Sequence, residues 1–195
     1  MHDAKTDYSA EVFGVNLASN LPLPGLRPAV AGAKAIAVLV NCGLEHDDQP
    51  MGLLPSGIRC RGRLLPHARL QFDAQCSDVE RVNWLCASLI PALLASGGAL
   101  VLRAAAVLSP AGAVLLVGPA MSGKSTMAAL LASAGWPIIS DDVLVLRRVG
   151  GEFRVFPGPP WVKLWPSMAT LGARLGPPLG SVRSGLSKTR FALPC

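Results

Sequence analysis

One stretch of nine residues has the types and spacing needed to hold a chain of phosphates. It matches the pattern Gly-x-x-x-x-Gly-Lys-Ser/Thr of a P-loop, also called a Walker A motif. In such a loop the backbone N–H groups surround the phosphates, the lysine reaches the β and γ phosphates, and the serine hydroxyl can bind Mg²⁺. The stretch consists of Gly118, Pro119, Ala120, Met121, Ser122, Gly123, Lys124, Ser125 and Thr126. We therefore expect these residues to bind a nucleotide.

An acidic pair, Asp141-Asp142, follows seventeen residues after Lys124. The apolar run Ile138-Ile139-Ser140 before the pair predicts a short strand, and in an α/β sheet the carboxyl end of that strand lies beside the P-loop. One carboxylate can then bind Mg²⁺ opposite Ser125, while the other accepts a proton from an attacking hydroxyl. The alternative is that the pair only caps or solvates a turn.

The elements that must position these residues can also be read from the pattern. Residues Ala113–Val117 form a buried-strand pattern, and Lys124–Ala134 has helical spacing that ends at Gly135. Residues 104–123 carry no charge, but Pro110 and Gly112 interrupt them, so two strands joined by a turn fit better than a membrane span. An earlier strand is expected over Ala99–Val107.

Downstream of the acidic pair, Val143–Val149 and Glu152–Phe156 flank Gly150-Gly151, which predicts a hairpin. Residues 157–195 are rich in Gly and Pro, and only Thr189–Leu193 suggests a further strand. Within that stretch we expect some aromatic and apolar side chains to pack in a core or lid rather than to stack on a base, and two lysines to be able to contact phosphate or substrate. These are Trp161, Leu164 and Trp165, and the lysines Lys163 and Lys188.

The first part of the chain reads as β-rich. Short apolar runs over Glu11–Leu17, Ala35–Val40 and Arg69–Asp73 alternate with turn-rich pieces such as Gln49–Gly57. Ser77-Asp-Val-Glu80 is then a capping box that opens a helix closed by Gly97-Gly98. The sequence therefore predicts a small β-rich unit over residues 1–80 and an α/β P-loop domain over residues 81–195, with the hinge within residues 77–98.

The net charge of +6 is unevenly distributed along the chain. Residues 1–152 balance twelve acids with twelve bases, whereas residues 153–195 have six bases and no acid. Two interpretations stay open: a solvated basic tail, or contacts to phosphates and an acidic peptide. The bases are isolated rather than clustered, which argues against nucleic acid.

Five scattered cysteines without a Cys-x-x-Cys pair argue against a disulfide framework or a zinc site and favour a reducing, cytoplasmic compartment. The polar N-terminus predicts no signal peptide, and no membrane partner is expected. Among P-loop proteins, the chain lacks the Asn-Lys-x-Asp sequence of GTPases and the Leu-Ser-Gly-Gly-Gln signature of transporter ATPases. It also lacks the arginine-rich lid of small-metabolite kinases.

The chain resembles the HPr serine kinase/phosphorylase superfamily, and within it the kinase-like relatives found beside peptide-modification genes. A P-loop followed so soon by a short strand and Asp-Asp is the most specific part of the resemblance. The similar blocks are Phe13–Leu26, Leu100–Val107, Leu116–Thr126, Gly135–Asp142 and Phe156–Pro166. The resemblance implies an HPr-kinase-like sheet with flanking helices.

The resemblance also implies roles for single residues. Lys124 and Ser125 would bind ATP·Mg²⁺, Asp141 would be the base for a seryl hydroxyl, and Asp142 would support the metal. Lys124 would share the catalytic role, since it reaches the transferred phosphate. The expected substrate is a peptide or small protein, such as a ribosomally made lasso-peptide precursor, and a homo-oligomer remains open.

Two departures from the family distinguish this chain. Arg103 stands where relatives have a histidine that pairs with the catalytic acid, so we expect Arg103 to pair with Asp141 and to lower its pKa. The histidines of the chain, His2, His46 and His67, all lie in the N-terminal unit. The chain also ends earlier than its relatives, which suggests a shortened member. The alternative function is therefore a nucleotide-binding accessory protein with impaired catalysis that recognises a peptide.

Overall fold

The computed structural model describes residues 8–31, 35–40, 49–53, 59–63, 68–72, 77–182 and 185–194. The fold is mixed α/β, with several small and mainly antiparallel sheets and few helices. The chain divides into two compact units, Met1–Leu85 and Cys86–Cys195.

The first unit contains a six-stranded sheet in the order β1-β2-β3-β6-β5-β4. Its strands are β1 Tyr8–Val12, β2 Val15–Ser19, β3 Ala35–Val40, β4 Gln49–Leu53, β5 Arg59–Arg63 and β6 Ala68–Phe72. The apolar run Glu11–Leu17 contributes to two strands, β1 and β2, and folds back at Phe13-Gly14, where both residues have positive φ. The turn expected at Gln49–Gly57 is partly wrong, because Gln49–Leu53 forms β4. Pro50 is tolerated there because β4 is an edge strand with a bulge.

A helical stretch leads from the first unit into the second. It consists of α1 Asp78–Trp84, a π-helical turn Leu85–Leu89 and α2 Ile90–Ser96. The Glu80 N–H donates to the Ser77 hydroxyl oxygen at 3.3 Å, which confirms the predicted capping box. The division between the two units falls within the π-helical turn, after Leu85.

The second unit has at its centre the strand β8 Ala104–Ser109, flanked by β9 Gly112–Val117 and β10 Ile138–Ser140. Both neighbours run antiparallel to β8, so β9 and β10 run parallel to each other. Their carboxyl ends therefore lie at the same end of the sheet, which is also where β8 begins. Three segments meet there: the loop after β9, the acidic pair after β10, and Arg103 before β8. The uncharged residues 104–123 contain the two predicted strands, β8 and β9, joined by a turn and followed by the loop of residues 118–123.

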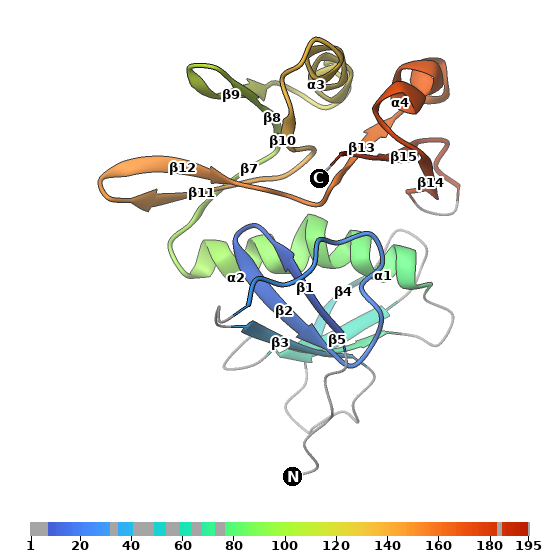
Figure 1. The fold of residues 1–195 in the computed structure, drawn as a ribbon. Coiled ribbons are helices and arrows are strands. Elements are labelled where there is room, and N and C mark those ends of the chain that lie inside the picture. Colours follow the sequence, from blue (N-terminus) through green and yellow to red (C-terminus); the bar gives the residue numbers. More distant parts are fainter. Residues whose placement is uncertain are drawn as a thin grey trace. The chain divides into compact units, whose positions relative to one another are not determined.

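The two faces of β8 pack against different elements (Figure 1). On one face Ala105 and Val107 pack against Ala128 and Ala129 of α3 Lys124–Ser133. On the other face Ala104 and Ala106 pack against a second sheet with the order β12-β11-β7. That sheet consists of β7 Leu100–Leu102, β11 Leu144–Val149 and β12 Glu152–Phe156.

The strand expected over Ala99–Val107 is therefore interrupted. Arg103 lies between β7 and β8, which belong to different sheets. The predictions of a helix after the P-loop, a strand at Ile138–Ser140 and a hairpin around Gly150-Gly151 are confirmed.

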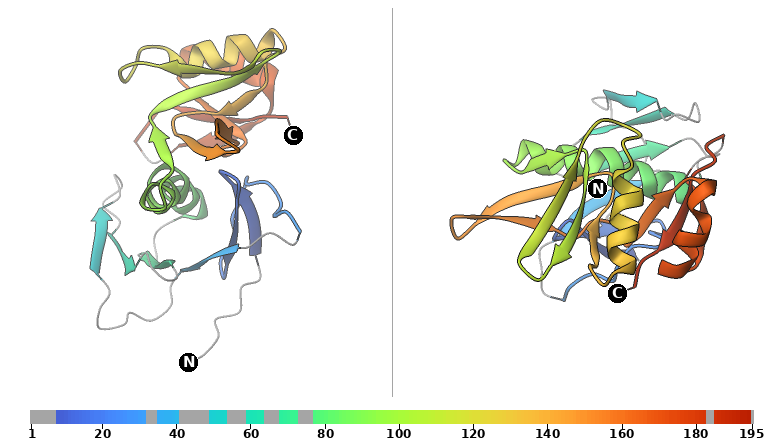
Figure 2. Two further views of the ribbon diagram at one scale, coloured as in Figure 1. Left: turned by 90° about the vertical axis from the view of Figure 1, so that its left-hand side faces the viewer. Right: turned by 90° about the horizontal axis from the view of Figure 1, so that it is seen from above.

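Residues 157–195 contain more regular structure than their sequence indicated (Figure 2). They form β13 Trp161–Leu164, a 3-10 turn Pro166–Met168, α4 Ala169–Leu175, β14 Pro178–Ser181 and β15 Thr189–Ala192. The strands pair in the order β13-β15-β14. Only the strand at Thr189 was expected. The other elements escaped notice because pieces of three to seven residues are too short to show periodicity.

Within the described residues no helix is both long and apolar enough to cross a lipid bilayer. Cys86 is buried and carries a free thiol, and burial raises its pKa to about 12. The side chains of the other cysteines, and all three histidines, lie outside the described part of the chain.

Close packing of α4 on β15 gives a first prediction. A Cβ added at Gly172 would overlap the ring of Phe191, which is 3% exposed. We expect Gly172→Ala to lower the free energy of unfolding by roughly 1–3 kcal/mol, as overpacking does. The matched control is Gly97→Ala, whose Cβ would sit 3.4 Å from the Leu94 carbonyl oxygen, and its effect should stay within about 0.5 kcal/mol. Urea denaturation followed by tryptophan fluorescence measures both, and equal stability of the two variants would contradict this packing.

Candidate functional site

The loop of residues 118–123 joins β9 to the first turn of α3. Its backbone includes two residues with positive φ, Met121 at 65° and Gly123 at 85°. A methionine in this conformation is uncommon, and such strain gathers at functional sites. Gly118 is also constrained by space, because a Cβ there would lie 2.9 Å from the Ser122 Oγ. The backbone conformation thus favours glycine at position 123, whereas at position 118 the absence of a Cβ leaves room for the Ser122 hydroxyl.

Lys124 lies folded over its own loop. Its Nζ donates hydrogen bonds to the carbonyl oxygens of Gly118 at 2.9 Å and Pro119 at 2.6 Å. The ammonium group is therefore held beside the backbone that would surround a phosphate, and an anion must compete with two carbonyls for it.

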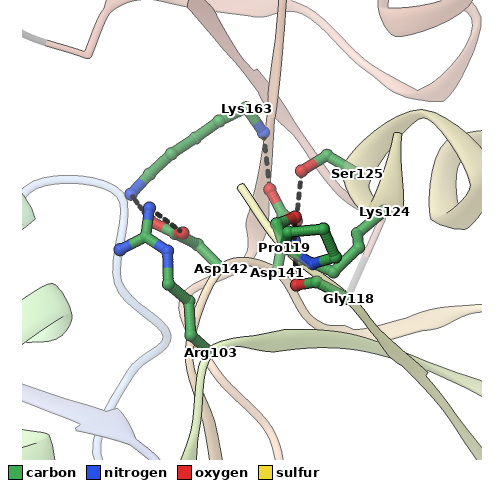
Figure 3. A network of polar contacts seen from close by, with 8 residues as sticks. All are labelled: Arg103, Gly118, Pro119, Lys124, Ser125, Asp141, Asp142 and Lys163. Carbon is green, nitrogen blue, oxygen red and sulfur yellow. Dashed lines mark hydrogen bonds and ion pairs between the residues drawn. The ribbon is translucent and has the colours of Figure 1, made fainter. Parts of the chain in front are cut away.

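Asp141 is buried and has two hydrogen-bond donors (Figure 3). The Ser125 hydroxyl donates to Asp141 Oδ1 at 2.7 Å, and the backbone N–H of Lys163 donates to Oδ2 at 2.9 Å. Burial raises the pKa of Asp141 above its ordinary value, because removal of water from the carboxylate outweighs the two hydrogen bonds that favour its charge.

Asp142 has φ 74° and a different environment. Lys163 Nζ lies 3.2 Å from its Oδ2, and Arg103 Nη2 lies 3.3 Å from its Oδ1. Burial would raise the pKa of Asp142, but the positive charges of Lys163 and Arg103 outweigh it and hold the pKa below its ordinary value. The neighbouring acids are thus shifted in opposite directions.

These side chains line a cavity of about 210 Å³. Its wall has four cationic side chains and two carboxyl groups, which suits an anionic ligand. They are Arg103, Lys124, Lys163, Lys188, Asp141 and Asp142.

The structure brings most of the predicted site residues together. The motif residues Ala120, Met121, Gly123, Lys124, Ser125 and Thr126 line the cavity. Gly118 and Pro119 supply carbonyls to Lys124, and Ser122 lies against Gly118. In contrast, Ser125 and Asp142, expected to share a metal, have different partners. The hydroxyl of Ser125 faces Asp141, and Asp142 faces two cations.

The expectation for Arg103 is wrong. Its guanidinium pairs with Asp142 rather than Asp141, and the pKa of Asp141 is raised rather than lowered. The reason is positional, because the break between β7 and β8 leaves the side chain of Arg103 72% exposed, while Asp141 points into the interior.

Sequence reasoning underestimated the C-terminal lysines. Lys163 was expected to be an ordinary surface lysine or a phosphate contact, yet its side chain is only 13% exposed and it contacts both aspartates. Lys188 Nζ lies 5.1 Å from the centre of the Trp165 ring, and both residues line the cavity. Trp161 and Leu164 are buried, so the core interpretation holds for them. The signal that could have revealed Lys163 is its place in an apolar Trp-Val-Lys-Leu strand, where every neighbour packs inward.

No three His, Cys, Asp or Glu side chains gather into a metal-binding group among the residues that the structure describes. Comparisons with protein-family models, with curated proteins and with solved structures found no match to this chain.

The opposite pKa shifts give a second prediction, tested in buffer with a chelator. Because the folded pKa of Asp141 is raised, its contribution to stability is present at low pH and is lost as the pH rises through that pKa. In the Asp141→Asn variant the new amide could keep both contacts, accepting from the Lys163 N–H and donating to Ser125. The free energy of unfolding of wild type minus that of Asp141→Asn should therefore fall as the pH rises above about 4.

Asp142→Asn is the matched control, because the folded pKa of Asp142 is lowered. Its difference from wild type should be constant above about pH 4 and shrink only at lower pH. Urea denaturation at several pH values gives both curves. Parallel curves for wild type and Asp141→Asn over the whole range would contradict the buried, destabilised carboxylate.

Proposed function

We propose that this chain is an ATP-dependent serine kinase of the HPr kinase type that acts on a peptide or small protein. The observation that carries the proposal is a cavity whose wall combines Lys124 and Ser125 of the P-loop motif with the buried carboxyl group of Asp141. A phosphate-binding loop and a proton acceptor on one cavity are the parts that phosphoryl transfer to a hydroxyl requires.

Binding of the ATP phosphates is supported by charge and by backbone geometry. The excess of cations on the cavity wall favours a polyphosphate, and the first turn of α3 directs its free N–H groups toward the loop. Lys124 would exchange the carbonyl oxygens of Gly118 and Pro119 for phosphate oxygens. The cost of breaking the two hydrogen bonds to neutral carbonyl oxygens is offset by charge-assisted hydrogen bonds to the phosphate oxygens.

The oxygen atoms near Ser125 fit Mg²⁺. This ion usually keeps several waters and takes one or two protein oxygens together with phosphates, so it needs no cluster of acids. Ser125 would hold it, and the carboxylate of Asp141 orients the Ser125 hydroxyl. Bound there, Mg²⁺ would supply positive charge to the β and γ phosphates. Asp142 is less suited, because Lys163 and Arg103 already neutralise it.

Transfer would use Asp141 as the proton acceptor. The seryl oxygen of the substrate attacks the γ phosphorus of ATP, and the seryl proton passes to Asp141. The bond between the γ phosphorus and the β–γ bridging oxygen breaks, and ADP leaves. A carboxyl group with a raised pKa is a better base at neutral pH than an ordinary aspartate. Lys163 N–H fixes the orientation of the carboxylate from the side opposite Ser125.

The accessory-protein alternative loses one of its supports. That support was Arg103 lowering the pKa of Asp141, whereas Arg103 binds Asp142 and burial raises the pKa of Asp141. The order β9, loop, α3, β10 and acidic pair supports the proposed relation to HPr kinases. Membership of that superfamily, and the lasso-precursor class of substrate, remain parts of this proposal.

Nucleotide binding gives a third prediction. At ATP·Mg²⁺ a hundredfold above its Kd, the free energy of unfolding should rise by about 2.7 kcal/mol, visible as a higher thermal midpoint. Lys124→Ala should abolish the rise. Arg174→Ala, which removes an exposed cation of α4 away from the cavity, should keep it. No rise for wild type at millimolar ATP would contradict the proposed nucleotide site.

Proton acceptance gives a fourth prediction. Asp141→Asn should retain the ATP·Mg²⁺-dependent thermal shift but lower phosphate incorporation into serine peptides by roughly 10²- to 10⁴-fold. Mass spectrometry of a serine-peptide library incubated with ATP measures incorporation. If Asp141→Asn instead loses the shift with ATP·Mg²⁺ while keeping it with ATP alone, Asp141 acts on the metal and the assignment as base is wrong.

A further inference from the structure

The second unit carries a strong positive charge that the cavity does not account for. Residues 86–195 contain ten Lys and Arg against three Asp and Glu. Outside the cavity, the hairpin of β11 and β12 holds three of these cations and a single acid. They are Arg147, Arg148, Arg154 and Glu152.

The hairpin presents these arginines on both of its faces. Arg147 and Arg154 stand directly opposite each other in the register, which places like charges side by side at a cost in stability. On the other face Arg148 is opposite Phe153, whose side chain is 68% exposed. Both Arg148 and Arg154 are exposed. One face thus has an exposed aromatic ring beside an arginine, and the other has two opposed arginines, of which Arg147 stacks 3.7 Å from the centre of the Phe156 ring. Exposed aromatic and arginine side chains are enriched at binding surfaces.

The hairpin also offers a backbone edge. Among the strands that the structure describes, β12 is the outer strand of the sheet β12-β11-β7. An outer strand presents N–H and C=O groups to which an extended polypeptide can be added. A nucleic acid cannot use this edge in the same way. A second copy of the chain would bring the same positive charge against the hairpin.

The base of the hairpin adjoins the cavity. Leu144 of β11 pairs with Leu102, the residue before Arg103, and follows Asp142 by two positions. Strands rise about 3.3 Å per residue, so the five residues from Asp142 to Arg147 span at most about 17 Å. An extended peptide covers that length in about five residues.

We propose that β12 and the arginines of this hairpin bind an acidic segment of the acceptor polypeptide as an added strand. The segment lies about five residues from the acceptor serine, so that docking delivers the serine to the cavity. The inference rests on the proposed kinase function for the identity of the bound chain as acceptor. The docking itself depends only on the hairpin.

The experiment measures binding without nucleotide, so that its failure is separate from failure of the kinase proposal. Each fluorescent probe peptide has one serine and two aspartates. The aspartates are centred about five residues before the serine in one peptide and about five residues after it in the other. The control peptides have asparagines in place of the aspartates. Fluorescence anisotropy at low salt should show one aspartate peptide binding roughly tenfold more tightly than its asparagine form, since each exposed ion pair contributes a few-fold. The preference should largely disappear at high salt.

Variants locate the surface. Arg154→Gln should lower the affinity for the aspartate peptide roughly threefold, and Arg174→Gln should leave it unchanged. Both remove one exposed arginine, but α4 lies at the opposite end of this unit from the hairpin in Figure 1 and in the right view of Figure 2. Arg154→Glu should reverse the preference toward a lysine peptide, which a misfolded variant could not do.

Three results would overturn the proposal. The first is equal affinity for aspartate and asparagine peptides, and the second is an equal loss in Arg154→Gln and Arg174→Gln, which would indicate unspecific attraction to a basic unit. The third is tighter binding of a single-stranded oligonucleotide of the same charge, which would assign the hairpin to nucleic acid.

Discussion

The hydrogen bond between the Ser125 hydroxyl and the buried carboxyl group of Asp141 is the contact on which the site depends. It links the first turn of α3 to the end of β10, and the second oxygen of Asp141 links the same point to β13 through the Lys163 N–H. Three segments that are far apart in the sequence are thereby fixed around one carboxyl group. Burial makes the charged form of this carboxyl group costly even with its two hydrogen-bond donors, as the raised pKa of Asp141 indicates.

The two neighbouring acids, Asp141 and Asp142, have opposite pKa shifts because their side chains face different surroundings. Asp141 turns inward, meets only neutral donors and has a raised pKa, whereas Asp142 has a left-handed backbone that turns its side chain toward Arg103 and Lys163. The backbone strain at Asp142 is thus what separates the two environments. If both carboxyl groups faced the same way, either both would be neutralised by cations or both would be desolvated. The pair thus places one desolvated carboxyl group beside one that is paired with cations. In the proposed kinase reaction the desolvated group would be the proton acceptor.

The parts of this arrangement that sequence could predict are those set by local rules. The helix after the glycine-rich loop, the strand before the acidic pair and the hairpin at Gly150-Gly151 follow from glycine positions and apolar runs, and the structure has all three. Ser77 capped its helix as expected for the same reason. The contacts of Arg103, Asp142 and Lys163 depend instead on a break between two sheets and on a strand more than twenty residues later. No local pattern encodes such pairings, so the partner of Arg103 was predicted wrongly and the bridging role of Lys163 was missed.

Sheet topology connects the cavity to the rest of the second unit. Because β8 runs antiparallel to both β9 and β10, the P-loop and the acidic pair meet at one end of the sheet, and Arg103 enters from the same end. Strand β11 begins two residues after Asp142, and Asp142 pairs with Arg103 and Lys163 of the cavity wall. The base of the hairpin is therefore held in place by these ion pairs. A polypeptide paired with β12 would therefore be aligned with a sheet whose strand β11 begins two residues after Asp142. Small alanines on both faces of β8 allow α3 and the sheet β12-β11-β7 to approach it closely. This close packing holds the hairpin rigidly with respect to the cavity.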